Sequence, residues 1–274
     1  MYLKPHRNFS QLPMSRRTAL TTLSAIGLAS CGGAGDSSET SIVSNAANSS
    51  SSSSSSNGSC TLSAPSCVVA PTETYGPYPA FTNGVVTLAS LWRTDMTTDP
   101  SGTYSQRQGV PLEMLIKLVN VNDNCAPLVG YDVYVWHCDA DGYYSYYSGQ
   151  PGYLGTKSYP NGYFLRAVQT TDACGEVTFT TIFPGWYPSR YTHVHIAVSI
   201  SAIAEAVTQM TWPASVITDV YTNATTYGTY TEHGAADTTF SGDNVFQGNT
   251  GQIASTTGSI DEGFQSQWVL GITV

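Results

Sequence analysis

The chain has 274 residues, with 10 Lys and Arg against 19 Asp and Glu, which gives a formal net charge of −9. Four of the basic residues and none of the acidic ones lie in the first 31 positions, so the rest of the chain carries six basic and nineteen acidic residues, near −13. This balance excludes a typical nucleic-acid-binding protein and a polybasic membrane patch. The six remaining basic residues are Arg93, Arg107, Lys117, Lys157, Arg166 and Arg190.

Residues 1–31 have the features of a bacterial export signal. The sequence Ser-Arg-Arg-Thr at 15–18 begins a twin-arginine pattern, although Ala19 stands where Phe is usual, so the twin-arginine and general secretory routes both stay open. The uncharged segment 18–30 is too short to span a bilayer. It ends in Leu-Ala-Ser-Cys, a lipobox that predicts lipidation of Cys31. We therefore expect a cell-envelope lipoprotein, facing the periplasm or the cell surface; a plain signal peptide with an incidental cysteine is the alternative.

Residues 32–59 form a Ser-rich segment with an unbroken serine run at 49–56, which predicts a disordered linker between the anchor and a domain at 60–274. Five cysteines follow position 31. In an oxidising compartment they predict up to two disulfides and one remaining thiol, with the pairing open. No pair has C-x-x-C spacing, which makes a cysteine-rich metal site less favourable. These cysteines are Cys60, Cys67, Cys125, Cys138 and Cys174.

From Cys60 onward the pattern is that of β-structure. Apolar, β-branched and aromatic runs alternate with clusters of Gly, Pro, Asn and Asp. Only residues 203–210 have a weakly helical pattern. The domain is therefore predicted to be all-β, a single sandwich or barrel. The predicted strands lie at 112–121, 131–138, 163–170, 177–183, 193–200 and 265–274.

The strand at 193–200 reads His-Val-His-Ile-Ala-Val-Ser-Ile. Side chains alternate between the two faces of a strand, so His193 and His195 share a face while the opposite face is apolar and packs into the core. Their Cα atoms are expected about 7 Å apart. This arrangement suits two ligands of one metal ion. Two hydrogen-bonded or surface histidines are the alternative interpretation.

Two loops rich in aromatic residues accompany this strand. One is Phe-Pro-Gly-Trp-Tyr-Pro-Ser-Arg at 183–190, and the other is Trp-His-Cys-Asp-Ala-Asp-Gly-Tyr-Tyr-Ser at 136–145. Together with Phe-Leu-Arg at 164–166, the segment 171–182 and His-x-His, these motifs resemble the intradiol ring-cleavage dioxygenases, the family that includes catechol and protocatechuate dioxygenases. Gly-Pro-Tyr at 76–78 is similar to the entry segment of that family. The resemblance covers about residues 67–212 and implies a β-sandwich of the intradiol type.

The resemblance also implies a ligand set for non-haem Fe(III). Tyr144, Tyr187, His193 and His195 match the family's iron ligands, with Tyr143 as an alternative to its neighbour. Ferric iron is a hard acid that favours anionic oxygen donors, so two phenolates and two neutral imidazoles suit it.

The resemblance further implies a reaction. A catechol-type substrate and O₂ would give a muconate-type dicarboxylate. Tyr187 would accept a substrate proton, Arg190 would stabilise developing negative charge, and Gln209 would hydrogen-bond an intermediate. Tyr75 stands where the family commonly has an acidic residue, and the family's helical dimerisation segment is not seen in the Ser-rich linker. Substrate identity and oligomeric state stay open.

Two other classes of function are compatible with parts of this pattern. A β-sandwich binding module could use its tyrosines and tryptophans to bind a polymer or an aromatic ligand without catalysis. A zinc or copper protein could use only His193 and His195. Retention of all four presumed iron ligands favours the dioxygenase.

Overall fold

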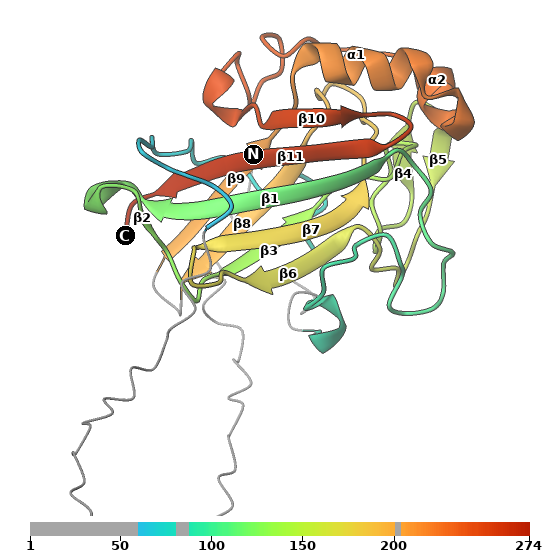
Figure 1. Ribbon diagram of the computed structural model, residues 1–274. Helices are drawn as coiled ribbons and strands as arrows, with labels where there is room; N and C mark the ends of the chain where they lie inside the picture. The colour runs from blue at the N-terminus through green and yellow to red at the C-terminus, as the bar shows by residue number, and fades with distance from the viewer. Residues whose placement is uncertain (1–59, 81–87, 201–203) are drawn as a thin grey trace, which may run out of the picture. The chain divides into compact units, whose positions relative to one another are not determined.

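The computed structural model describes residues 60–80, 88–200 and 204–274, which are the coloured parts of the chain in Figure 1. The predicted export signal at 1–31, with its lipobox Cys31, and the predicted linker at 32–59 lie outside these residues. Within the described ranges, no helix is both long enough and apolar enough to cross a bilayer.

The domain is built mainly from two β-sheets, which form two layers in Figure 1. The first sheet has the order β10-β11-β1-β2, with β7 also paired to β1, and the second has the order β6-β3-β8-β9. The first sheet consists of β1 (Pro111–Asn120), β2 (Ala126–Pro127), β7 (Glu176–Ile182), β10 (Ser255–Ser259) and β11 (Gly263–Ile272). The second consists of β3 (Asp132–Trp136), β6 (Arg166–Thr170), β8 (Val194–Ile200) and β9 (Ala204–Met210).

The remaining elements are short. A two-stranded hairpin is formed by β4 (Gln150–Gly152) and β5 (Gly155–Lys157). The α-helices are α1 (Ala214–Asn223) and α2 (Thr229–His233). Single 3₁₀ turns are η4 (Ala89–Leu91), η5 (Val121–Asp123), η6 (Thr225–Tyr227) and η7 (Thr250–Gln252).

The prediction of an all-β domain is confirmed, and all six predicted strands are present with small shifts at their ends. The helical prediction for 203–210 is wrong for the described residues, because 204–210 form β9 and pair antiparallel along β8. The helix α1 was not predicted. It buries Ile217, Val220 and Tyr221, which lie three or four positions apart on one helix face.

The core lies between the two sheets. From β8, Val194, Ile196 and Val198 belong to the same buried cluster as Leu112 and Met114 of β1. The alternation predicted for 193–200 is therefore confirmed, and the other face of β8 lies away from this core. On that face, His195 pairs laterally with Trp136 of β3 and with Gln209 of β9. A second buried cluster, which includes Tyr144 and Tyr187, covers it.

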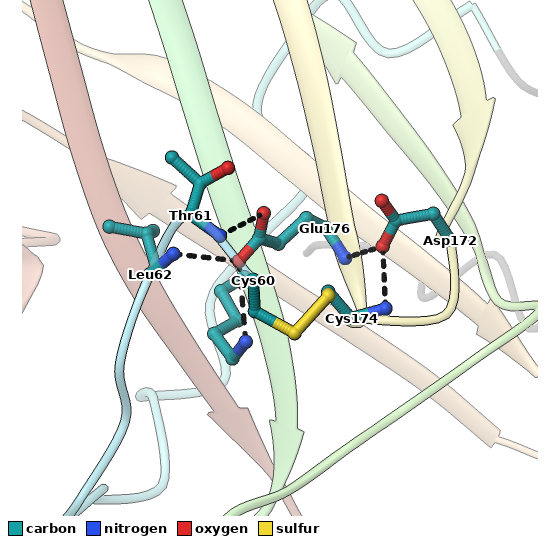
Figure 2. The surroundings of a disulfide bond; sticks show 7 residues. Cys60, Thr61, Leu62, Asp172, Cys174 and Glu176 are labelled. Atoms are coloured by element: carbon teal, nitrogen blue, oxygen red, sulfur yellow. Dashed lines mark hydrogen bonds and ion pairs between the residues drawn. A yellow bond between two sulfur atoms is a disulfide. The ribbon is translucent and has the colours of Figure 1, made fainter. Parts of the chain in front are cut away.

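Two disulfides hold the N-terminal segment of the domain, and the predicted number of disulfides and thiols is confirmed. They join Cys60 to Cys174 and Cys67 to Cys125, while Cys138 is a buried thiol. Figure 2 shows that Glu176 accepts hydrogen bonds from the backbone N–H groups of residues 61 and 62 beside the first disulfide. Residues 60–62 are thus held against the start of β7 by the disulfide and by these hydrogen bonds.

The helices brace the loop that precedes β8. The Tyr221 hydroxyl of α1 donates to the Pro184 carbonyl at 2.9 Å and lies 3.1 Å from the Thr192 hydroxyl. The Tyr230 hydroxyl of α2 donates to the Phe183 carbonyl at 2.5 Å. Both ends of the loop 183–192 are therefore fixed by buried tyrosines, and this loop carries Tyr187 and Arg190.

Candidate active site

The two histidines of the His-x-His motif meet at the buried outer face of the second sheet. Their Nε2 atoms are 3.1 Å apart, and both side chains are almost fully buried. The Nδ1 atom of His193 lies 2.5 Å from the Tyr191 carbonyl, so Nδ1 carries the proton and Nε2 presents a lone pair. His195 stacks on Trp136 at a centroid distance of 4.8 Å, which fixes the orientation of its ring. Both imidazoles are thus held with Nε2 toward a common point.

The tyrosine loop after β3 brings Tyr144 to the same point. The Tyr144 hydroxyl lies 3.1 Å from Nε2 of His195, and the side chain is fully buried. The side-chain amide of Gln150 fixes the Tyr144 backbone by accepting from its N–H at 2.8 Å and donating to its carbonyl at 2.7 Å. Tyr143 points elsewhere, because its hydroxyl donates to the Gly155 carbonyl at 2.7 Å. Tyr144 rather than Tyr143 therefore joins the histidines.

The second tyrosine, Tyr187, lies beside this group. Its ring centroid is 5.6 Å from that of Tyr144 and 5.4 Å from that of His193. The two tyrosine loops approach closely at Gly142, where a Cβ atom would lie 2.1 Å from the Trp186 carbonyl oxygen. With φ at +89°, this position favours glycine on backbone grounds as well. The glycine of the Gly-Tyr-Tyr sequence thus lets both loops reach the same site.

Arg190 holds Tyr187 and Gln209 together. Its guanidinium donates to the Tyr187 hydroxyl at 3.2 Å, to Gln209 Oε1 at 2.5 Å and to Asp243 Oδ2 at 2.8 Å. All of these groups are buried. The Nε2 atom of Gln209 has no hydrogen-bond partner among the described residues, so it remains available as a donor at the site. The structure therefore joins Arg190 and Gln209 to the same cluster as the four predicted ligands.

A segment before β1 covers the cluster. At Gly76, which has φ of +70°, a Cβ atom would come within 2.8 Å of Cε1 of His195. The Tyr78 ring lies 4.9 Å from that of Tyr144 and 6.1 Å from that of Tyr187. The Gly-Pro-Tyr sequence singled out above is thus in van der Waals contact with the site.

Burial sets the protonation of these groups in the protein alone. It raises the pKa of Tyr144 well above its usual value and that of Tyr187 to about 12, against the opposing effect of Arg190. Burial, with the neighbouring cations, lowers the pKa values of His193 and His195 well below the usual range. The imidazoles are therefore neutral and keep their lone pairs, whereas the phenols need a strong positive charge nearby to ionise.

This donor set fits a hard trivalent metal ion. Two neutral imidazoles and two phenols converge in a buried site, where Nε2 of His195 lies 3.1 Å from Nε2 of His193 and 3.1 Å from the Tyr144 hydroxyl. A ferric ion would supply the charge that ionises the phenols. Among the described residues, no group of three or more His, Cys, Asp or Glu side chains could hold a metal ion, so a metal at this site would need the tyrosines as ligands.

Several contributors were not found from the sequence. Asp243 neutralises Arg190, and its carboxylate has no exposed surface. Glu73 lies nearby: burial raises its pKa to about 7, against the opposing effects of Gln252 and Arg190, and its Oε1 accepts from Gln252 at 2.5 Å. These residues belong to segments without a regular pattern, so no spacing in the sequence could associate them with the His-x-His strand.

Among the comparisons with known proteins, only the comparison of structures gives matches. No family model matches the chain, and no curated protein sequence does. An intradiol ring-cleavage dioxygenase from Tetranychus urticae is similar in structure, with a TM-score of 0.61, 25% identity and coverage of 76% of this chain and 95% of that one. The chain has the fold of the intradiol ring-cleavage dioxygenases. The resemblance seen in the sequence is thereby confirmed, and the predicted class of ring-cleaving oxidoreductase agrees with it.

Two other solved dioxygenase structures are less similar to this chain. The dioxygenase domain of a dioxygenase carbohydrate-binding protein fusion from Streptomyces sp. SirexAA-E has 21% identity and a TM-score of 0.49, over 76% of this chain and 99% of that one. A hydroxyquinol 1,2-dioxygenase from Pseudomonas putida has 15% identity and a TM-score of 0.48, over 75% and 67%.

Proposed function

We propose that this chain is an Fe(III)-dependent intradiol dioxygenase that cleaves a catechol-type ring with O₂ to a muconate-type dicarboxylate. One observation carries the proposal: the Tyr144 hydroxyl lies 3.1 Å from Nε2 of His195, which in turn lies 3.1 Å from Nε2 of His193, and Tyr187 stands beside them. The structural similarity of this chain to the intradiol ring-cleavage dioxygenase from Tetranychus urticae supports the same activity.

Tyr144, Tyr187, His193 and His195 would hold the ion. Bound ferric iron would act as a Lewis acid that lowers the pKa values of the catechol hydroxyls and makes the ring reactive toward O₂. In the overall reaction the carbon–carbon bond between the two hydroxyl-bearing carbons breaks, and each of these carbons gains one oxygen atom of O₂. Both atoms of O₂ enter the product, so no other reductant is required.

The chain's own residues would manage protons and charge. A catechol that binds as a dianion loses two protons; the phenolate oxygen of Tyr187 can accept one of them, and hydroxide or water from solvent accepts the other. Arg190, which donates to the Tyr187 hydroxyl, favours the phenolate before the transfer. The same guanidinium and the unpaired Nε2 of Gln209 are placed to stabilise negative charge that develops on the substrate oxygens.

The adjacent tyrosines provide a matched test. The iron-loaded protein is expected to be purple-red, because tyrosinate-to-iron charge transfer absorbs visible light, and to consume catechol and O₂ in equal amounts. Tyr144→Phe should lose most of the visible band and the ring cleavage. Tyr143→Phe should keep both, because its hydroxyl is bound to the Gly155 carbonyl. A colourless iron-loaded wild type, or a Tyr144→Phe variant with the wild-type spectrum, would refute the proposal.

We further propose that the domain is exported and attached to the membrane through a lipid on Cys31. The residues 28–31 and the serine run at 49–56 motivate this. The two disulfides support an oxidising compartment. Metabolic labelling with a radioactive fatty acid should mark the wild type, while Cys31→Ala should be unlabelled and released from the membrane fraction.

A further inference from the structure

Every lysine and arginine after position 31 lies within the described residues, and the charge of each is already engaged. Four form ion pairs, and two donate to neutral oxygens. The ion pairs are Arg107 with Asp139 at 3.6 Å, Lys117 with Glu176 at 3.3 Å, Lys157 with Asp141, and Arg190 with Asp243 at 2.8 Å.

Two of these cations lie beside the candidate active site, and neither is free to bind an anionic substituent. Arg190 is paired with buried Asp243, and its other N–H groups are directed at Tyr187 and Gln209, so it serves the reacting oxygens and not a substituent elsewhere on the ring. Arg166 has no exposed surface and lies behind the Tyr144 ring, with Cζ 5.9 Å from the ring centroid. Its guanidinium donates to the hydroxyl and the carbonyl of Ser145, both at 2.9 Å, and to a tyrosine hydroxyl of β3 at 3.0 Å. A substrate anion could reach it only by displacing these bonds.

In the described part of the chain, the two histidines outside the ligand set, His137 and His233, add no positive charge. Burial lowers the pKa of His137 to about 4, and its ring nitrogens lie 2.7 Å from the Cys138 carbonyl and 2.7 Å from the Thr181 hydroxyl. Burial also lowers the pKa of His233. Both rings are therefore neutral near pH 7.

An acidic side chain lies near the site instead. The Oε1 atom of Glu73 accepts from Nε2 of Gln252 at 2.5 Å, and the same Nε2 donates to the Gln209 carbonyl at 2.9 Å, so Glu73 lies one side chain away from Gln209. Its Oε2 is buried and has no hydrogen-bond partner in the described part of the chain. The surroundings are otherwise aromatic, since Tyr78 and Tyr147 pack against the buried cluster that contains Tyr144. Neutral aromatic rings and the carboxylate of Glu73 therefore lie around the site, together with the Arg190–Asp243 ion pair.

We propose that the substrate is a catechol without an anionic substituent: the ring carries no carboxylate, sulfonate or phosphate. This inference rests on the proposed dioxygenase function and names the substrate class of the same site. A ring carboxylate would be buried without a cationic partner, beside Glu73, in a domain whose net charge repels anions. Alkyl, hydroxyl or amide substituents avoid this cost.

The test compares two ligands that differ in charge and hardly in size, 3,4-dihydroxybenzoate and 3,4-dihydroxybenzamide. Anaerobic titration of the iron-loaded full chain at pH 8, followed by the visible spectrum, gives both dissociation constants; O₂ uptake gives kcat/KM. We expect the benzoate to bind at least about 100-fold more weakly than the amide, because a buried unpaired carboxylate is costly. Glu73→Gln should narrow this ratio. Glu262→Gln, an exposed acidic position, should leave it unchanged.

The outcomes separate this inference from the proposed function. Benzoate binding within about 3-fold of the amide would overturn the inference and leave the dioxygenase standing. Cleavage of the benzoate in preference to the amide would do the same. If neither ligand nor catechol itself shifted the spectrum or consumed O₂, the proposed function would fail and the inference with it.

Discussion

The buried ion pair between Arg190 and Asp243 gives the sharpest test of how the site is held. The Asp243 carboxylate accepts on both oxygens: Oδ2 from Arg190 Nε at 2.8 Å and from the Tyr191 N–H at 2.7 Å, and Oδ1 from the Val245 N–H at 2.8 Å and the Phe246 N–H at 3.1 Å. Each carboxylate oxygen accepts from two N–H donors. In Asp243→Asn one oxygen is replaced by an NH₂ group, which cannot accept, so two of these donors lose their acceptor. The variant also leaves Arg190 buried without a counter-charge.

The expected loss in the free energy of unfolding is about 3–5 kcal/mol, the usual cost of removing one partner of a buried pair. Asp237→Asn is the matched control. Asp237 is exposed and accepts only the Ser189 N–H, at 2.9 and 3.1 Å, which an amide oxygen can still do. Its loss should stay below about 1 kcal/mol. Urea unfolding of the oxidised full chain, followed by tryptophan fluorescence, measures both.

The pH dependence of the Asp243 effect has a definite sign. Burial alone would raise the pKa of Asp243, but the hydrogen bonds from Arg190 and the backbone outweigh it, and the pKa lies below the ordinary 3.8. The stabilisation is therefore complete above 3.8 and is lost as the pH falls through the lower folded-state pKa. Asp243→Asn should then approach the wild type in strong acid. Equal losses for Asp243→Asn and Asp237→Asn near pH 7 would refute this reasoning.

Three further predictions concern the N-terminal part of the domain, from Cys60 to Gly76. Cys60→Ala opens a disulfide between residues 114 apart, and urea unfolding should show a loss of about 4–5 kcal/mol. Gly76→Ala should bind less iron by metal analysis, and its free energy of unfolding should fall by about 1–3 kcal/mol, because the new Cβ meets the His195 ring at a positive φ. Gly102→Ala is the control: its φ is similar but its surroundings are open, so it should lose stability without losing iron. Burial raises the pKa of Glu73 from 4.5 to about 7, so wild-type stability should fall from pH 5 to pH 8 relative to Glu73→Gln; parallel curves would contradict this.

Regular local patterns made part of the fold and site predictable. Polar or small and apolar side chains alternate along 193–200. Because the apolar side chains must enter the core, both histidines were predicted to lie together on the opposite face of the strand. The segment 203–210 gave no such signal, since its small alanines suit either a helix or a strand. Its conformation is decided by seven-residue pairing with β8, a contact that local propensity does not contain.

The remainder of the site depends on contacts between distant segments. Asp243 lies 53 residues from Arg190, in irregular chain, and the Glu73–Gln252 bond joins positions 179 apart. Neither pair has a spacing or motif that local physics could interpret. The disulfide pairing is similar, because five cysteines allow several combinations and only the folded chain brings Cys60 to Cys174.

The segment between Cys67 and Ala80 links the disulfides to the candidate active site. It adds no strand to either sheet. Isolated backbone hydrogen bonds attach it to the domain: the Ala70 N–H donates to the Gly271 carbonyl, and the Glu73 N–H donates to the Val207 carbonyl. Such a segment gains little from cooperative pairing, so its ordering entropy must be offset elsewhere. The Cys67–Cys125 disulfide restricts its freedom in the unfolded chain. The cover over His195 is therefore best formed where disulfides form, which joins the chemistry of the site to the proposed export of the protein.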